Sequence, residues 1–173
     1  PEGPFGESHG HIALEEYNMP MRITAITRRQ KAIVPSYISQ VAPSESSVIK
    51  RVAYEPLFLR HLRDENNIKG IKKVSLHEPL TGLLRVTVIT CDANMPRTEI
   101  WRALYSAAFF KGDCSKICIA VNEDIDVDNA DALLWAMSYR TNPSEDMQIL
   151  PHRGQGHGPK REHDGEEDSS VLI

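Results

Sequence analysis

Three short runs rich in valine, isoleucine and leucine constrain the fold of this chain more than any other feature of its sequence. They predict buried β-strands over Ile71–Leu76, Leu83–Thr90 and Ile117–Val121. Apolar residues at helical spacing predict one helix between the second and third strands and a shorter helix after Asp128. A last short strand is predicted at Met147–Leu150. This order favours an α/β (α+β) fold in which helices pack on one mixed sheet.

The residues ahead of these runs show two further patterns. Apolar and polar residues alternate over Met21–Thr27 with several β-branched side chains, which predicts a strand, and Ala32–Pro35 predicts a second, shorter one. Ser47–Arg63 then shows an apolar face close to the helical period. Pro56 lies inside that helix, and we expect a kink or break there because proline lacks the N–H that the helix ladder needs.

Polar residues near the expected helix starts are candidate caps. Ser44 or Ser46 can cap the helix that begins near residue 47. Asp128, with Asp131 three residues later, has the spacing of a capping box for the helix after the third strand.

The first eleven residues form a proline- and glycine-rich segment that cannot be a helix. Two carboxylates, Glu2 and Glu7, lie five residues apart around Phe5. A stiff, turning loop can hold both carboxylates toward one point, where burial and mutual repulsion raise the pKa of one of them. Such a pair suits acid–base chemistry at neutral pH. The alternative is a surface turn that carries two solvated glutamates.

Three motifs extend this interpretation, since together they resemble one enzyme family. PEGPFGE at the start of the chain is similar to the catalytic loop of the UbiD family of decarboxylases, which use prenylated FMN. Arg22–Arg29 resembles a strand of that family, and Val121–Val127, with LWAM at 134–137 and Arg140, resembles its acidic signature. The motifs come in the order of the family and roughly at its spacing, and the resemblance extends from Pro1 to about Pro159.

The resemblance implies a role for several residues of this chain. Glu7 corresponds to the general acid that protonates carbon after CO2 has left, and Glu2 to the carboxylate that anchors a catalytic arginine. Ile49 falls where the family presents an apolar side chain to the substrate. Lys111 or Lys116 falls near the lysine close to the cofactor, and the spacing does not choose between the two. The catalytic arginine, and the residues that bind a divalent metal ion and potassium, are expected to lie upstream of this chain.

The resemblance also implies a division of the chain. Residues 1–35 correspond to the catalytic loop and last strands of a flavin-binding split β-barrel, 36–63 to a connecting helix, and 64–150 to a C-terminal α/β oligomerisation domain. We expect residues 151–173 to be a flexible, glycine-rich and acidic tail. A start inside the catalytic loop and an apolar end predict a fragment truncated at both ends, inactive without the rest of the enzyme.

The expected function is therefore part of a non-oxidative (de)carboxylase. Its substrate class is an aromatic or α,β-unsaturated carboxylic acid, and its cofactor is prenylated FMN. The alternative is an oligomerisation domain without activity of its own, which builds a homo-oligomer such as a dimer or hexamer. A metal-dependent hydrolase that uses the histidines is the weakest hypothesis, because no set of three or four ligands converges in the sequence.

Composition excludes other classes of function. The 20 basic and 24 acidic residues give a net charge of −4, which does not favour nucleic acid as a partner. No apolar run approaches the roughly 20 residues that span a bilayer, and we expect no signal peptide. An odd set of cysteines, Cys91, Cys114 and Cys118, predicts reduced thiols in a cytoplasmic protein. We expect no membrane partner and no metal ligand in this chain.

Overall fold

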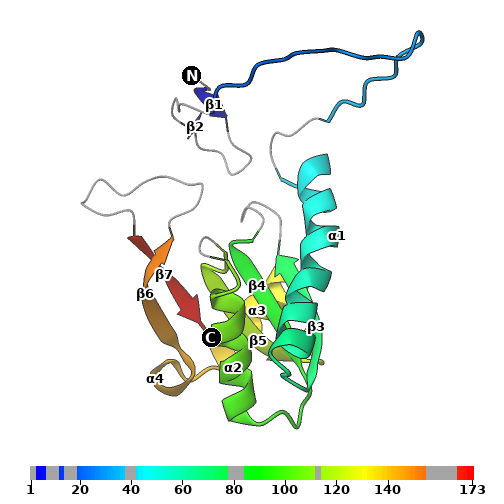
Figure 1. The fold of residues 1–173 in the computed structure, drawn as a ribbon. Coiled ribbons are helices and arrows are strands. Elements are labelled where there is room, and N and C mark those ends of the chain that lie inside the picture. The colour runs from blue at the N-terminus through cyan, green and yellow to red at the C-terminus, as the bar shows by residue number, and fades with distance from the viewer. Residues whose placement is uncertain are drawn as a thin grey trace.

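A mixed five-stranded sheet forms the centre of the protein in a computed structural model, with strands in the order β3-β4-β5-β7-β6 (Figure 1). The structure describes residues 3–6, 12–13, 19–37, 42–77, 84–111, 114–154 and 167–173. The five strands are β3 (Ile71–His77), β4 (Val86–Cys91), β5 (Ile117–Asn122), β6 (Gln148–Gly154) and β7 (Glu167–Leu172). The helices are α1 (Glu45–Arg60), which continues into a π-helical turn η1 (His61–Glu65), α2 (Arg97–Ala108), α3 (Ala130–Tyr139) and α4 (Pro143–Asp146).

The three inner strands of the sheet are parallel and both edges are antiparallel. Strand β5 pairs in parallel with β4 on one side and β7 on the other, whereas β3 runs antiparallel to β4 and β6 antiparallel to β7. Helices cover both faces, as parallel strands require because they are apolar on both sides. The prediction of a mixed sheet with helices packed on it is confirmed.

Two hydrophobic clusters lie on opposite faces of this sheet. The larger cluster packs α1 and α2 against one face, and includes Phe58, Leu104 and Ile89. The smaller cluster packs α3 against the other face, and includes Val88 and Leu133. Val88 and Ile89 are neighbours in β4, and both are fully buried. Their side chains point to opposite faces of the sheet, as successive residues of a strand do.

The expectation that residues 151–173 form a flexible tail is wrong for 151–154 and 167–173, while residues 155–166 lie outside the described part of the chain. Strand β6 extends to Gly154, and β7 at Glu167–Leu172 inserts between β5 and β6. Leu172 is completely buried and lies opposite Cys118 in the parallel pairing. The local composition resembles a loop, but pairing with strands distant in the sequence decides the structure of these residues.

The strands expected at Met21–Thr27 and Ala32–Pro35 are absent, since residues 19–37 contain no strand. The side chains that the alternation assigns to a buried face are open to solvent, with Met21 83% and Ile23 65% exposed. A strand needs a neighbour to complete its hydrogen bonds, and none of the described strands pairs with this segment. The N-terminal strands of the described residues are instead a small antiparallel pair, β1 (Phe5–Gly6) and β2 (Ile12–Ala13).

Helix α1 begins as its sequence predicts. The Ser44 side chain accepts a hydrogen bond from the Ser47 N–H, and the Ser47 hydroxyl in turn accepts from the Ser44 N–H, so a capping box closes the first turn. The helix then continues through Pro56 to Arg60, so the expected break at Pro56 is wrong, and the alternative expectation of a kink stays a prediction.

The cap of α3 is Asn129 and not Asp128. The Asn129 side chain accepts hydrogen bonds from the N–H groups of Asp131 and Ala132. Asp128 is one residue too early to reach them, and its carboxylate contacts cations on two other elements instead.

Candidate functional site

The residues that sequence analysis singled out are only partly within the described structure. Glu2 and Glu7 lie outside the described residues. Ile49 lies in the first half of α1 and is 55% exposed. Lys111 follows the end of α2, and Lys116 immediately precedes β5; both have exposed side chains.

The structure distinguishes the two lysines by what they contact. The Lys111 ammonium donates to the Tyr54 hydroxyl over 3.2 Å and lies 5.1 Å from the centre of the Tyr54 ring. Tyr54 belongs to α1, the helix that carries Ile49. The main chain of Lys111 is held too, because its carbonyl accepts from the Arg153 guanidinium at 3.3 Å. The ammonium group of Lys111 therefore lies against α1.

Lys116 has a different position. Its carbonyl accepts the Val171 N–H over 2.8 Å, in the pairing of β5 with β7. The backbone of Lys116 therefore belongs to the sheet, whereas that of Lys111 lies beside the end of α2.

The acidic signature includes the loop that connects β5 to α3, and Asp124 and Asp128 tie this loop to other elements. The Asp124 carboxylate accepts two bonds from Arg140, at 3.0 and 2.6 Å, and the Arg140 guanidinium also lies 5.0 Å from the Trp135 ring centre. The Arg140 hydrogen bond holds the pKa of Asp124 below its usual range. The spaced Asp, Trp and Arg of the signature thus form one contact between the loop and α3.

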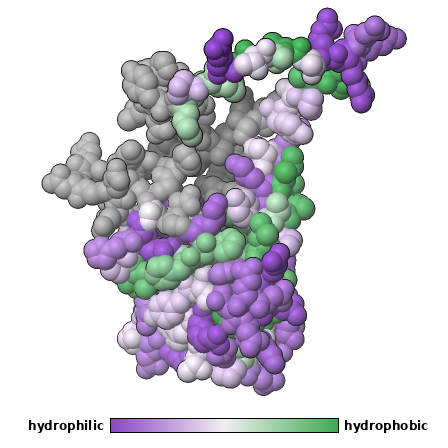
Figure 2. All heavy atoms as spheres, viewed as in Figure 1, coloured by the Kyte–Doolittle hydropathy of each residue, from purple (hydrophilic) through white to green (hydrophobic). Residues whose placement is uncertain are grey.

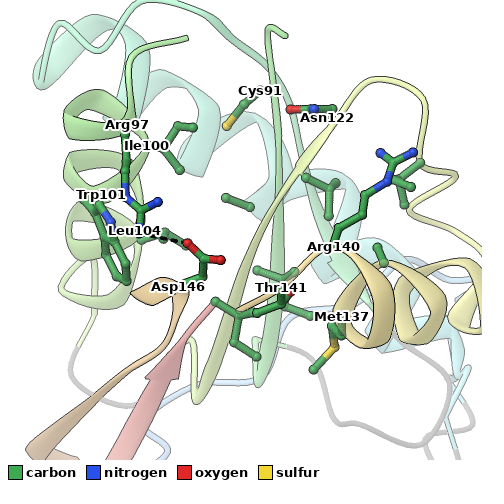
Figure 3. A pocket seen from close by; sticks show the side chains of 16 residues that line it. Cys91, Arg97, Ile100, Trp101, Leu104, Asn122, Met137, Arg140, Thr141 and Asp146 are labelled. Carbon is green, nitrogen blue, oxygen red and sulfur yellow. Dashed lines mark ion pairs between the residues drawn. The ribbon is translucent and has the colours of Figure 1, made fainter. Parts of the chain in front are cut away.

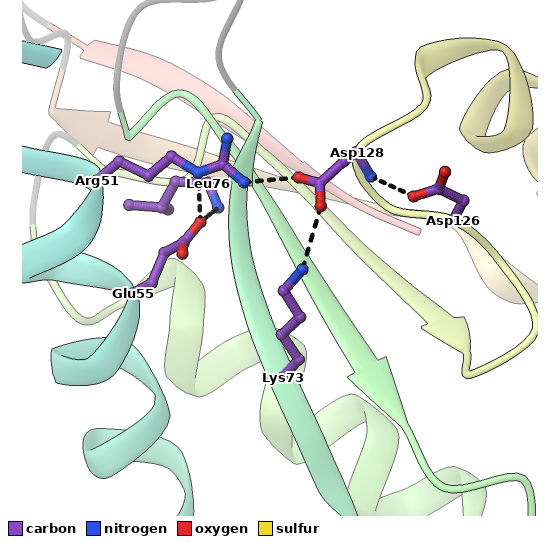
Figure 4. A network of polar contacts seen from close by, with 6 residues as sticks. All are labelled: Arg51, Glu55, Lys73, Leu76, Asp126 and Asp128. Atoms are coloured by element: carbon purple, nitrogen blue, oxygen red, sulfur yellow. Dashed lines mark hydrogen bonds and ion pairs between the residues drawn. The ribbon is translucent and has the colours of Figure 1, made fainter. Parts of the chain in front are cut away.

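Asp128, at the end of this loop, connects three elements (Figure 4). One carboxylate oxygen accepts from Arg51 of α1 at 2.6 Å, and the other accepts from Lys73 of β3 at 3.3 Å. Glu55 accepts from the Arg51 Nε at 2.8 Å and from the Leu76 backbone N–H at 2.9 Å. We call Arg51, Glu55, Lys73, Leu76 and Asp128 the Asp128 network. Hydrogen bonding to Arg51 is the main reason that the pKa of Asp128 is lowered.

A cavity of about 240 Å³ lies between α2 and α3 at the carboxyl ends of β4 and β5 (Figure 3). Its walls are largely apolar and include Ile100, Trp101 and Val121. Its charged residues are already paired: Arg97 donates to Asp146 at 2.8 Å and to the Glu145 carbonyl at 2.7 Å. The cavity therefore has space for a small apolar group. The sequence did not indicate it, since its walls come from separate strands and helices.

The cysteines have the properties of structural thiols. All three are buried and in the thiol form. Burial raises the pKa of Cys91 to about 11 and that of Cys118 to about 12, so both stay protonated at neutral pH and are poor nucleophiles. No three His, Cys, Asp or Glu side chains in the described part of the chain come together as metal ligands. Among the same residues, no helix has the length and apolar character that a membrane crossing requires.

Curated proteins similar to this chain are longer than it. An uncharacterized protein of Archaeoglobus fulgidus is 26% identical over 153 residues, which is 87% of this chain and 30% of that protein. An uncharacterized protein of Synechocystis is 25% identical over 153 residues, which again is 87% of this chain and 30% of that protein. The chain thus spans about a third of the length of the curated relatives it matches.

Solved structures share the fold. The UbiD-class enzyme HmfF from Pelotomaculum thermopropionicum in complex with FMN superposes with a TM-score of 0.73 at 20% identity, over 98% of this chain and 36% of that one. Vanillic acid decarboxylase from Sedimentibacter hydroxybenzoicus, in its open form, superposes with a TM-score of 0.67 at 19% identity, over 88% and 32%. At this level of identity the likeness shows the fold alone.

A family model decides the membership. The model of the 3-octaprenyl-4-hydroxybenzoate carboxy-lyase C-terminal domain matches residues 48–172. The match runs from the first half of α1 to the end of β7, and so includes all five strands of the sheet and both arginine contacts of the acidic loop. This chain therefore belongs to the UbiD family, and residues 48–172 are its C-terminal domain.

Proposed function

We propose that this chain is part of a UbiD-type (de)carboxylase that acts on an aromatic or α,β-unsaturated carboxylic acid. The observation that carries the proposal is the family match over residues 48–172, preceded in the same chain by the string PEGPFGE with Glu2 and Glu7. The matched relatives are longer proteins, so the activity belongs to the whole enzyme and not to residues 48–172 alone. We further propose a cytoplasmic location, in line with three cysteines in the thiol form.

We propose prenylated FMN as the cofactor. HmfF has been solved in complex with FMN and, in an evolved dimeric form, with prFMN. Of the residues described here, Lys111 fits such a group, because its ammonium is held at α1 and suits the anionic phosphate of a flavin nucleotide. When bound, the cofactor supplies a place for the electron pair that CO2 leaves behind. A divalent metal ion and potassium would be bound elsewhere in the enzyme.

Glu7 supplies the proton in this proposal. The bond between the substrate carbon and its carboxylate breaks, the electron pair stays on the substrate side, and CO2 leaves. The Glu7 carboxylic acid then gives its proton to that carbon and is left as a carboxylate. Glu7 must be neutral before this step, and an apolar site from which water is excluded favours the neutral form. Glu2 orients the catalytic arginine, and Ile49 provides an apolar contact for the substrate.

Replacement of Glu7 tests the mechanism. In the full-length enzyme reconstituted with cofactor, Glu7→Gln keeps the shape of the side chain but removes the transferable proton. The decarboxylation rate should fall by about 10²- to 10⁴-fold, the usual contribution of general acid catalysis. Glu16→Gln, a carboxylate outside the motif, is the matched control and should retain the wild-type rate. Turnover by Glu7→Gln at the wild-type rate would remove Glu7 from this role.

The alternative function, oligomerisation without chemistry, has an observation in its favour. Large apolar side chains are exposed on the described helices, including Leu134 at 60% and Tyr139 at 78% on α3. Figure 2 shows hydrophobic residues on the surface of α1 as well. Light scattering of the purified chain at micromolar concentration tests this proposal, which predicts a dimer or hexamer. A monomer at that concentration contradicts it.

A further inference from the structure

Helix α1 has two unlike parts. Phe58 is completely buried in the larger core cluster, and so is Leu62 in the turn that follows. Before Tyr54 the apolar residues of the helix are open to solvent: Val48 is 48%, Ile49 55% and Val52 69% exposed. Packing therefore holds the second part of the helix to the sheet but contributes little to the first.

Pro56 lies between these two parts. Proline has no N–H, so it cannot donate to the carbonyl of Val52 one turn earlier, and its ring crowds that carbonyl. The helix is thus missing one hydrogen bond within a turn of Tyr54, the first residue of the helix that packs against the larger core cluster. A helix bends most easily at such a point.

Polar contacts tie the first part of α1 to the sheet just before Pro56. Within the Asp128 network, Arg51 reaches Asp128 across 77 residues of sequence, and Glu55 accepts the N–H of Leu76 in the edge strand β3 (Figure 4). The pair formed by Tyr54 and Lys111 adds a contact with the segment after α2. These bonds fix the direction of the helix where packing does not.

Asp128 holds a central position in the network because it accepts from two cations on different elements. Its own position is set by the loop, since the Asp126 carboxylate accepts the Asp128 N–H at 3.1 Å and Arg140 ties Asp124 to α3. Without the Asp128 carboxylate, the contacts among the described residues leave Arg51 with its bond to Glu55 on the same helix. That bond cannot hold the helix to the β5–α3 loop.

We propose that the Asp128 network closes a hinge at Pro56 and thereby sets the direction in which the first part of α1 leaves the sheet. This gives the β5–α3 loop, which carries the acidic signature and ends with Asp128, a mechanical role as the fixed point against which the helix is held. If the proposed function is right, Arg51 and Asp128 are also positioning residues for Ile49. The hinge itself does not depend on that function.

Hydrogen exchange of the backbone amides tests the hinge without cofactor or substrate. In this 173-residue chain, Asp128→Asn should speed exchange of the amides at Val48–Tyr54 by about fivefold, the effect of losing a partly exposed charged contact. Exchange at Leu57–Leu62 and in β4 should change by less than about twofold, because packing holds these residues. Asp131→Asn removes an equal charge close by and should leave both regions at wild-type rates. No change at Val48–Tyr54, or an equal change everywhere, would overturn the proposal.

A second variant separates a hinge from a simple loss of charge. Pro56→Ala restores the missing N–H, so the first part of α1 gains a continuous helix ladder. In that background Asp128→Asn should speed exchange at Val48–Tyr54 by less than about twofold. An undiminished fivefold effect would show that Pro56 is not the hinge. Asp128→Glu, made in the chain that keeps Pro56, retains the negative charge. Its backbone amides at Val48–Tyr54 should therefore exchange at close to the wild-type rate.

Discussion

Residues 19–37 and strand β4 both contain β-branched residues of the kind that favour strands, but they differ in their structural surroundings. Ile23 lies in an alternating run but is 65% exposed in extended chain without strand partners among the described residues, whereas Ile89 of β4 is completely buried. Strand β4 has a hydrogen-bonded neighbour on each side, β3 and β5, and a helix layer over each face. This difference shows that β-branched residues favour a strand but do not form one by themselves. A buried strand also needs neighbouring strands to bond with and a layer of helices to cover it.

The same substitution in the two regions sharpens this comparison most strongly. Ile89→Ala opens a cavity in the larger core cluster and should lower the free energy of unfolding by about 2–5 kcal/mol. Ile23→Ala should change it by no more than about 0.5 kcal/mol, because Ile23 is already in contact with water. Urea denaturation of both variants measures the difference. Equal losses would mean that residues 19–37 are buried in solution.

Buried and exposed arginines provide a second contrast. Arg153 is 6% exposed, and its guanidinium lies over the Phe109 ring. It donates hydrogen bonds to the carbonyls of Ala108 and Lys111, at and just after the end of α2, and to the Ser170 hydroxyl. Arg153→Met removes the guanidinium donor from the buried Ala108 carbonyl, whereas the Lys111 carbonyl still accepts the Cys114 N–H. The substitution should cost about 1.5–3 kcal/mol of unfolding free energy.

Arg22, in the exposed segment, gives the matched control for that variant. Arg22→Met should leave the unfolding free energy within about 0.5 kcal/mol of wild type. Denaturation curves in urea compare the two. A stable Arg153→Met variant would show that water satisfies the Ala108 carbonyl at the end of α2.

The corrected helix cap gives a smaller effect. Asn129→Ala removes the acceptor for the N–H groups of Asp131 and Ala132, so it should lower the unfolding free energy by about 1 kcal/mol. Asn129→Asp keeps an acceptor at the same place and should be close to wild type. Thermal unfolding followed by circular dichroism distinguishes these outcomes. A neutral Asn129→Ala variant would show that the cap is dispensable to α3.

Lowering the pH should produce the smallest change in stability. It should act only on the α/β unit, that is, on the five-stranded sheet and the helices packed on it. Arg140 lowers the pKa of Asp124 and Arg51 lowers that of Asp128, whereas residues 19–37 contain no carboxylate side chain. A folded-state pKa below the unfolded value stabilises the protein above about pH 4, and this contribution is lost as the pH falls through the folded pKa.

The size of that effect is limited by exposure, since the Asp124 and Asp128 side chains are each 55% exposed. Urea denaturation of wild type and of the double variant Asp124→Asn, Asp128→Asn should show wild type as the more stable protein at pH 7. The difference should shrink steadily below about pH 4. A difference that stays constant down to pH 2 would contradict the lowered pKa values.

Sequence alone was sufficient for features that depend on residues a few positions apart. The strand and helix order between Ile71 and Leu150, and the Ser44 cap, follow from periodicity and capping chemistry, which act within one or two turns. The string PEGPFGE and the acidic signature pointed to the UbiD family, to which the match over residues 48–172 assigns the chain.

Tertiary structure alone decided what depends on residues far apart. The insertion of β7 between β5 and β6, the partners of Asp128, and the contact of Lys111 with α1 each join segments separated by dozens of residues. Local pattern carries no information about such pairs, because their free energy comes from groups that meet only once the sheet has formed. For the same reason the alternating run at 19–37 resembled a strand in sequence, and did not become one without strand neighbours in the described structure.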